Sequence, residues 1–209
     1  MTAGLSLRFA LRDFFHNSWR LAPVNAAFGV VVVAVGIAAY AVHALLVLAV
    51  IAGPVAAALI HCAVVLVRTE NLALADARQG LRLHWRRGVQ LGAAGLALVV
   101  LGVLAVRFYT RIGFGWPLVF LTLYLLLGLG MYLAMVATVA IADPERPLRL
   151  AARDAATVGA RRPGATLLLG LSLLLVNAAG VAAGVMPFLT LTIAYSFVAV
   201  AHFTLPKES

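Results

Sequence analysis

Long apolar runs alternate with short polar segments along the chain. The runs cover residues 25–50, 54–67, 89–106, 116–142, 165–184 and 187–205, and a turn at Gly53-Pro54 separates the first two. A bilayer core about 30 Å thick is crossed by roughly 20 apolar residues in a helix. The pattern therefore predicts an all-α integral membrane protein, with one helical-bundle domain of about six transmembrane helices. A turn near His43 is an alternative division of the first stretch, and Arg68 is expected to snorkel because the second run is short.

Residues 1–23 form a mixed segment before the first run. Arg8, Arg12, His16 and Arg20 recur at four-residue spacing, with apolar residues on another face. This spacing predicts an interfacial amphipathic helix. Its basic stripe is interpreted either as a cytoplasmic flank that orients the first span or as a lipid-binding element.

Charge and composition support a membrane location. Hydrophobic residues make up 64% of the 209 residues, and the net charge is +9. With six spans, every Lys and Arg except Arg107 and Arg111 falls on one side, together with all seven acidic residues. The positive-inside rule then places both termini in the cytoplasm. Of the 16 cationic residues only Lys207 is lysine, a bias that we attribute to a GC-rich bacterial genome, and the expected location is the cytoplasmic membrane of a bacterium. No basic run is interleaved with aromatic residues, which argues against nucleic-acid binding.

A shift of 75 residues superposes two polar segments of the chain. Glu70 aligns with Glu145, and Arg86-Arg87 aligns with Arg161-Arg162. Residues 72–85 and 148–158 are each predicted to form a short amphipathic cytoplasmic helix. Each apolar face either lies on the membrane or the underside of the bundle, or docks into a partner. The candidate partner contacts are Arg68, Glu70, Leu81, Trp85, Arg86, Arg87, Leu148, Arg153, Asp154, Arg161 and Arg162.

The apolar runs contain little that suggests chemistry. No Asp, Glu, Lys or Arg lies within a predicted span, which argues against an ion-coupled carrier and an intramembrane protease. We therefore predict no enzymatic activity, no cofactor and no metal. His61 beside Cys62 is interpreted as an interhelical hydrogen-bonding group or as a functional group. The candidates for a polar pathway are His61, Thr190, Thr192, Tyr195 and Ser196.

Several short motifs resemble the YesL-like family of small bacterial membrane proteins. They are the run from Pro54 to Leu59, then Arg68-Thr69-Glu70, and the arginine-rich segment ending at Pro163. The chain departs from the family in its longer first span and in Leu81 and Trp85, where the family tends to have phenylalanine. The resemblance implies an accessory permease component, because members are often encoded beside carbohydrate ABC importers.

The leading hypothesis is a non-enzymatic membrane subunit of a transport complex, and the resemblance implies carbohydrate import as its role. Its expected partners are the lipid bilayer, other transporter subunits or an ABC ATPase, and a second copy of the chain. A stand-alone small-solute carrier and a structural or lipid-interacting scaffold are the alternatives.

Overall fold

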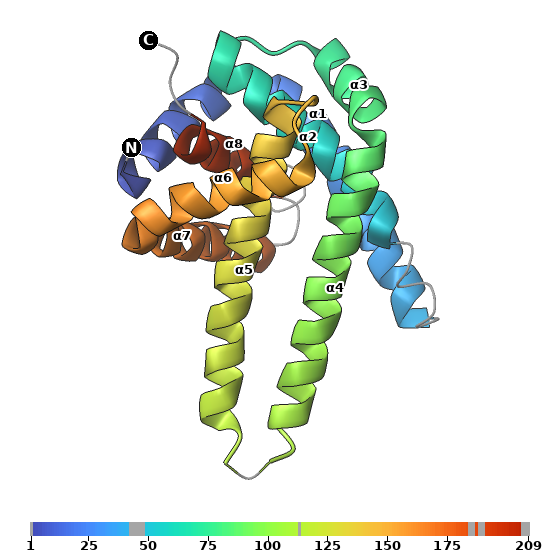
Figure 1. Cartoon of the computed structure of the whole chain (residues 1–209). Helices are drawn as coiled ribbons and strands as arrows, with labels where there is room; N and C mark the ends of the chain where they lie inside the picture. Colours follow the sequence, from blue (N-terminus) through green and yellow to red (C-terminus); the bar gives the residue numbers. More distant parts are fainter. Residues whose placement is uncertain (1, 42–48, 113, 184–186, 188–190, 206–209) are drawn as a thin grey trace.

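The chain is all-helical in the part that the structure describes. The structure is a computed structural model and describes residues 2–41, 49–112, 114–183, 187 and 191–205. Figure 1 shows the arrangement of its eight α-helices. They are α1 (Ala3–Ala41), α2 (Ala52–Thr69), α3 (Leu74–Leu83), α4 (Trp85–Tyr109), α5 (Trp116–Ala142), α6 (Leu148–Arg161), α7 (Pro163–Ala182) and α8 (Ile193–Thr204).

Five of these helices, α1, α2, α4, α5 and α7, are long and apolar enough to cross a bilayer. This confirms an all-α fold and indicates a multi-pass membrane protein. The sixth predicted span, 187–205, is represented mainly by α8, which has 12 residues. At 1.5 Å per residue such a helix is about 18 Å long, which is shorter than a hydrocarbon core. Residues 188–190 of that predicted span lie outside the described residues.

The first helix does not break where the sequence predicted a boundary. α1 runs for 39 residues and includes Pro23, so the predicted interfacial segment 1–23 and the start of the first span form one helix. Proline lacks an N–H and removes one helical hydrogen bond. The helix continues because its buried side chains Ala10, Phe14 and Leu21 are followed by Asn25, also buried, on the same core-facing side.

The second helix begins earlier than predicted. α2 starts at Ala52, so Pro54 lies in its first turn, where a missing N–H costs nothing. The predicted turn at Gly53-Pro54 is therefore wrong, because both residues lie inside α2. The alternative turn near His43 lies outside the described residues. α2 has 18 residues and is longer than the predicted span 54–67. The Arg68 side chain therefore needs to extend less far to reach the lipid headgroups than the sequence suggested.

Glycine contacts bring α2 and α4 very close together. A Cβ atom added to Gly53 would lie 2.1 Å from the Gly88 carbonyl oxygen, and one added to Gly92 would lie 2.9 Å from the Gly53 Cα. Small residues allow this approach between membrane helices, where packing rather than hydrophobicity drives association. In Figure 1, α4 and α5 descend together as a hairpin, whereas α6 and α7 lie across the upper part of α5.

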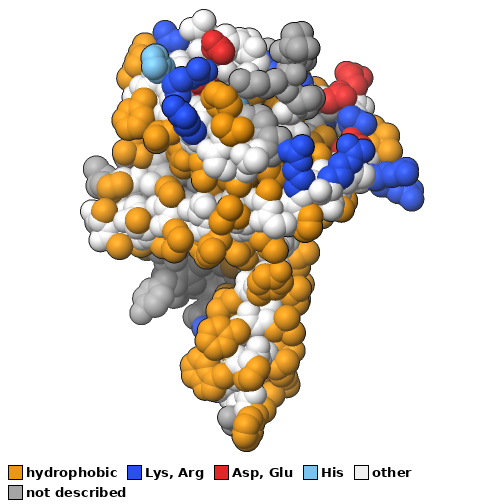
Figure 2. All heavy atoms as spheres, turned by 90° about the vertical axis from the view of Figure 1, so that its left-hand side faces the viewer, with side chains coloured by type: hydrophobic (Ala, Val, Ile, Leu, Met, Phe, Trp, Pro, Cys, Tyr) orange, Lys and Arg blue, Asp and Glu red, His pale blue; other side chains and the backbone are white. Residues whose placement is uncertain are grey.

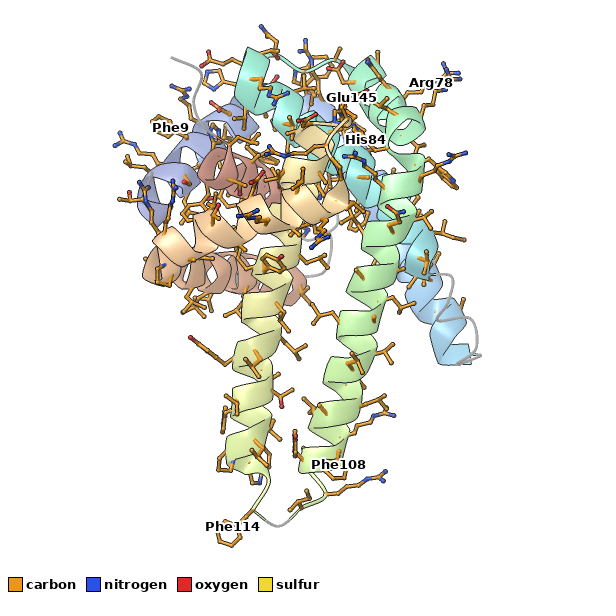
Figure 3. The ribbon with its side chains drawn as sticks, viewed as in Figure 1. Phe9, Arg78, His84, Phe108, Phe114 and Glu145 are labelled. Atoms are coloured by element: carbon orange, nitrogen blue, oxygen red, sulfur yellow. The ribbon has the colours of Figure 1, made fainter. Side chains whose placement is uncertain are left out.

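Charged and apolar surfaces separate along the molecule. Figure 2 shows cationic side chains gathered on the upper part and apolar side chains covering the lower part of the hairpin. Figure 3 shows Arg78, His84 and Glu145 at one end and Phe108 and Phe114 at the other. We call the first the charged end. Exposed aromatic residues at the opposite tip, Phe108, Phe114 and Trp116, are typical of a membrane interface.

The 75-residue repeat corresponds to two similar sets of helices. In α2–α3–α4 and in α5–α6–α7, a long helix is followed by a short one and then by another long one. Each short helix packs on the long helix that precedes it: α3 packs on α2, and α6 packs on α5. Both predicted polar helices are thus confirmed as helices, and both lie at the charged end (Figure 1).

Candidate functional site

The apolar stripe predicted for α3 is only partly buried. Leu74 and Trp85 leave 53% and 51% of their surface exposed, whereas Leu81 is half-buried. The helix is rotated so that Gly80 faces α2. A Cβ added to Gly80 would lie 2.8 Å from the Cβ of His61, so only glycine fits there. The close approach of backbones, rather than the largest apolar side chains, decides which side of α3 is buried.

Arginines share the exposed side of α3 with these apolar residues. Arg78 and Arg82 are exposed, and at 100° per residue they project close to Leu74 around α3. Trp85 is also exposed and follows the break at His84 as the first residue of α4. We call Leu74, Arg78, Arg82 and Trp85 the α3 face. It combines apolar and cationic groups at the charged end of the molecule, outside the five long apolar helices apart from Trp85, the first residue of α4.

A histidine pair joins α2 to the junction between α3 and α4. Nε2 of His84 lies 3.2 Å from Nδ1 of His61, within hydrogen-bonding distance. His84 is 1% exposed. Burial, then the neighbouring His61 and then Arg87 lower the pKa of His84 to about 4, because each disfavours the charged form. His61, predicted as a pathway or packing residue, is thus a hydrogen-bonding group at a helix junction.

Arg87 and Arg68 bind the end of α5 rather than facing solvent freely. The Arg68 Nη1 donates to the Ala142 carbonyl at 3.1 Å. The Arg87 guanidinium donates to four carbonyls at and after the end of α5, those of Ala140, Asp143, Pro144 and Arg146. A helix end leaves carbonyls without intrahelical partners, and a cation there also interacts favourably with the helix dipole. Both residues therefore fix the second half of the bundle to the first.

The face of α6 is covered by the bundle itself. Ala151 and Ala155 are fully buried, Leu148 is half-buried, and the Tyr132 hydroxyl of α5 donates to the Ala152 carbonyl at 3.1 Å. The apolar face of α6 is therefore buried against the bundle itself, which is one of the alternatives that the sequence left open for it. Among the predicted contacts on and beside α6, Asp154 pairs with Arg146 at 2.7 Å, and Arg153, Arg161 and Arg162 are exposed.

Glu70 ends α2 in the left-handed conformation, with φ of 59°. This conformation is usual for glycine and costs other residues about 1 kcal/mol. Its carboxylate lies 3.8 Å from the Arg12 guanidinium, an exposed contact that contributes little. The predicted contact residue is thus a strained helix terminus next to α1.

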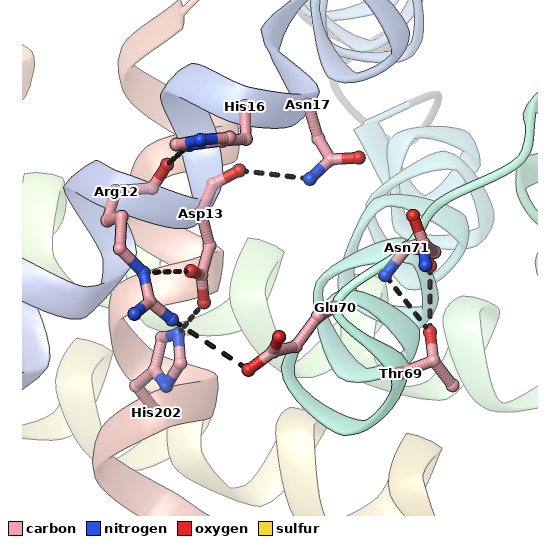
Figure 4. Close-up of polar contacts among 8 residues, drawn as sticks. All are labelled: Arg12, Asp13, His16, Asn17, Thr69, Glu70, Asn71 and His202. Carbon is pink, nitrogen blue, oxygen red and sulfur yellow. Dashed lines mark hydrogen bonds and ion pairs between the residues drawn. The ribbon is translucent and has the colours of Figure 1, made fainter.

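A buried ion pair that the sequence interpretation missed links the first and last helices. Nε2 of His202 in α8 lies 2.8 Å from Oδ2 of Asp13 in α1, and the two side chains are 4% and 7% exposed. Arg12 Nε donates to the other carboxylate oxygen at 3.0 Å. Figure 4 shows Arg12 between Asp13 and Glu70, so this group connects α1, α2 and α8. One signal was available: His202 is the one histidine in the last predicted span.

The hydroxyl groups predicted to line a pathway bind neighbouring helices. Asn177 of α7 donates to Ser196 Oγ at 2.7 Å and accepts from Thr192 Oγ1 at 3.0 Å. The Tyr195 hydroxyl donates to the Leu7 carbonyl of α1 at 3.2 Å. Thr190 lies outside the described residues. These contacts hold α8 against α7 and α1.

A cavity of about 440 Å³ lies between α2, α4 and α5, and its lining is apolar or glycine. Such a cavity offers no group for acid–base or nucleophilic chemistry. Among the described residues, no three His, Cys, Asp or Glu side chains are grouped so that they would hold a metal ion.

Comparison with known proteins identifies no relative. No family model matches the chain, and no curated protein or solved structure matches it. The resemblance to the YesL-like family therefore stays a prediction, and the fold places the chain among helical, multi-pass membrane protein candidates with five possible spans.

Proposed function

We propose that the chain is a non-enzymatic subunit of a transport complex in the cytoplasmic membrane of a bacterium, and that it docks a partner protein through the α3 face. The observation that supports this most directly is the exposure of Leu74 and Trp85 beside Arg78 and Arg82. An exposed group of apolar and arginine side chains is the composition found at protein interfaces.

The packing narrows the set of contact residues. Arg68 and Arg87 already donate to carbonyls at the end of α5, and the inner face of α6 is covered by α5. The residues that support docking are therefore those of the α3 face, with the exposed Arg86 at its edge. The exposed Arg78, Arg82 and Arg86 beside apolar side chains favour a partner that presents carboxylates around an apolar pocket.

The position of α3 in the molecule also supports a protein partner. In Figure 1, α3 extends beyond the start of α4, at the end opposite to the hairpin tip. The division of cations between the two ends favours a cytoplasmic location for this end. An exposed cytoplasmic helix carried by a membrane bundle is suited to contact a soluble subunit such as an ATPase. The assignment to carbohydrate import depends on the YesL-like resemblance alone.

The test is purification of the full chain, tagged and expressed at its native level, followed by identification of associated proteins. We expect a permease or ATPase subunit to copurify, and we expect the double substitution Arg78→Glu and Arg82→Glu to abolish its recovery. The matched control is Arg149→Glu, an exposed arginine of α6, which should leave recovery unchanged. The proposal would be contradicted if no transport subunit copurified. It would also be contradicted if the wild type, the double variant and the Arg149→Glu control recovered equal amounts of it.

The stand-alone carrier and the scaffold predict different results. A carrier would take up solute in proteoliposomes that contain this protein alone. A lipid-binding scaffold would depend on the basic stripe of α1, but Arg12 pairs with Asp13 and Arg20 donates to the Leu72 carbonyl. Because these arginines have partners inside the protein, less of the stripe is free for lipid.

A further inference from the structure

We propose that the hydrogen-bonded pair His61–His84 is a proton-responsive joint that holds α3 on α2 and releases it when both imidazoles become protonated. The pair lies where three helices meet: His61 is in the middle of α2, and His84 is the single residue between α3 and α4. A change at this residue alters the angle of α3 directly.

The hydrogen bond requires that at least one imidazole is neutral. One ring nitrogen donates and the other accepts across 3.2 Å, and an imidazolium has no acceptor left. A single proton can still be shared between the rings. A second proton removes the acceptor and leaves two positive charges with ring centroids 5.1 Å apart. The contact then changes from attractive to repulsive.

The surroundings of the pair disfavour the charged state. Arg87 of α4 adds a positive charge next to His84, and the carboxylate of Asp76 in α3 is the acidic group near His61. Asp76 also accepts the Ala73 N–H at 2.7 Å at the start of α3. Among the described residues, Nδ1 of the buried His84 has no hydrogen-bond partner, so a proton placed there gains no acceptor.

The pH range in which the histidine contact weakens follows from the lowered pKa of His84. The pKa of His84 is lowered from 6.5 to about 4, so the folded protein keeps the ring neutral more strongly than the unfolded chain does. The contact is fully present above pH 6.5, weakens as the pH falls toward 4, and is lost below that value. Acidification therefore opens the joint.

The second copy of the repeat shows that a short helix does not need such a pair for packing. The positions equivalent to His61 and His84 are Val136 and Gly159. Val136 is buried, and a Cβ added to Gly159 would lie 3.3 Å from the Met135 methyl group, a close contact that the flexible methionine end must yield slightly to accommodate. The histidines are thus a feature of α3 alone. No third ligand completes a metal site among the described residues, which favours proton binding over metal binding.

Release of the joint has a large effect because α3 is short. An isolated helix of ten residues is marginally stable in water, so α3 depends on its contact with α2. If α3 docks a partner as proposed above, the joint makes that docking sensitive to acid. The joint itself does not rest on that function, and its test needs no partner.

The experiment uses the full chain in detergent micelles with Trp19→Phe and Trp116→Phe, which leaves Trp85 as the fluorophore because the chain has three tryptophans. A second readout is the distance between spin labels at Thr69→Cys and Gln79→Cys in a Cys62→Ser background. When the pH is lowered from 7 to below 4, we expect the Trp85 emission to shift and the label distance to increase, with the midpoint below 6.5.

His84→Gln should abolish both changes, because an amide keeps a hydrogen bond to His61 but does not titrate. His61→Gln should have the same effect, and it serves as the second variant if His84→Gln does not fold at pH 7 by circular dichroism. The control His16→Gln, at an exposed histidine, should titrate like the wild type. A constant label distance in the wild type, or an unchanged transition in both glutamine variants, would overturn the proposal. Loss of copurifying subunits with an intact transition would count against the docking function only.

Discussion

Replacement of Gly53 by alanine tests the closest contact in the bundle. The added Cβ would lie 2.1 Å from the Gly88 carbonyl oxygen and 2.8 Å from the Gly92 Cα. Nonbonded atoms of these types prefer separations of about 3.5 Å, and backbone atoms have no rotamer by which to move away. α2 and α4 must therefore separate by about 1 Å. Overpacking of this kind costs about 1–3 kcal/mol, and occasionally more.

The free energy of unfolding should be measured by thermal denaturation in a mild detergent. For a chain of this size, a loss of about 3 kcal/mol lowers the unfolding temperature by roughly 6–12 °C. Gly128→Ala in α5 is the matched control, because a Cβ there meets nothing within 4 Å and alanine favours the helix. If Gly53→Ala unfolds at the same temperature as Gly128→Ala, α2 and α4 do not pack through their glycines, and the reasoning is refuted.

Three further predictions use the same unfolding assay. Arg87→Ala should destabilise by about 2–4 kcal/mol, because carbonyls at the end of α5 lose a charged donor, whereas Arg86→Ala at the exposed neighbour should change stability by less than about 0.5 kcal/mol; equal effects would contradict the anchoring role. Asp13→Ala should cost about 3–5 kcal/mol, since it leaves His202 buried without its carboxylate; a neutral effect would show that the pair is not buried. Glu70→Gly should stabilise by up to about 1 kcal/mol, because glycine adopts φ of 59° without strain; destabilisation would show that the contact with Arg12 outweighs the strain.

Helix boundaries at charged residues were predicted well from the sequence. The predicted span 116–142 matches α5, and 89–106 lies within α4, because arginines, Asp143 and Pro117 mark where an apolar run must end. Helix boundaries inside apolar stretches were not predicted well. The change from the mixed segment 1–23 to the apolar run that begins at Asn25 suggested a boundary that α1 passes without a break, and Gly53-Pro54 suggested a turn where the structure has a tight helix–helix contact. The pattern of apolar residues shows which segments avoid water, but it does not show which helices pack closely against each other.

The sequence predicted where the candidate site lies, but it did not predict which of its side chains are buried or paired. The sequence placed two short helices at one end of the molecule, and it aligned Leu74, Ala77, Leu81 and Trp85 as the apolar face of the first one, to be covered by the membrane, by the bundle or by a partner. The structure buries Gly80 instead, because a glycine allows the backbone to reach His61. The pairing of Asp13 with His202 was also missed, since the two residues are 189 positions apart and no local pattern joins them.

Comparison of the two copies of the repeat shows which positions of α3 serve packing within the chain and which do not. The buried positions correspond: Gly80 of α3 aligns with Ala155 of α6, and both are small residues that lie against the preceding long helix. The exposed positions do not correspond, because Leu74 and Trp85 align with Arg149 and Ala160, which are themselves exposed. α6 also exposes one large apolar side chain, Leu150, at 44%, so an exposed leucine alone does not distinguish α3. What distinguishes α3 is that Leu74 lies beside the exposed Arg78 and Arg82, close to Trp85 at the start of a long apolar helix. Packing within the described chain does not account for these side chains, so the simplest physical reason for them is a surface that covers α3 from outside, either the membrane interface or a partner protein.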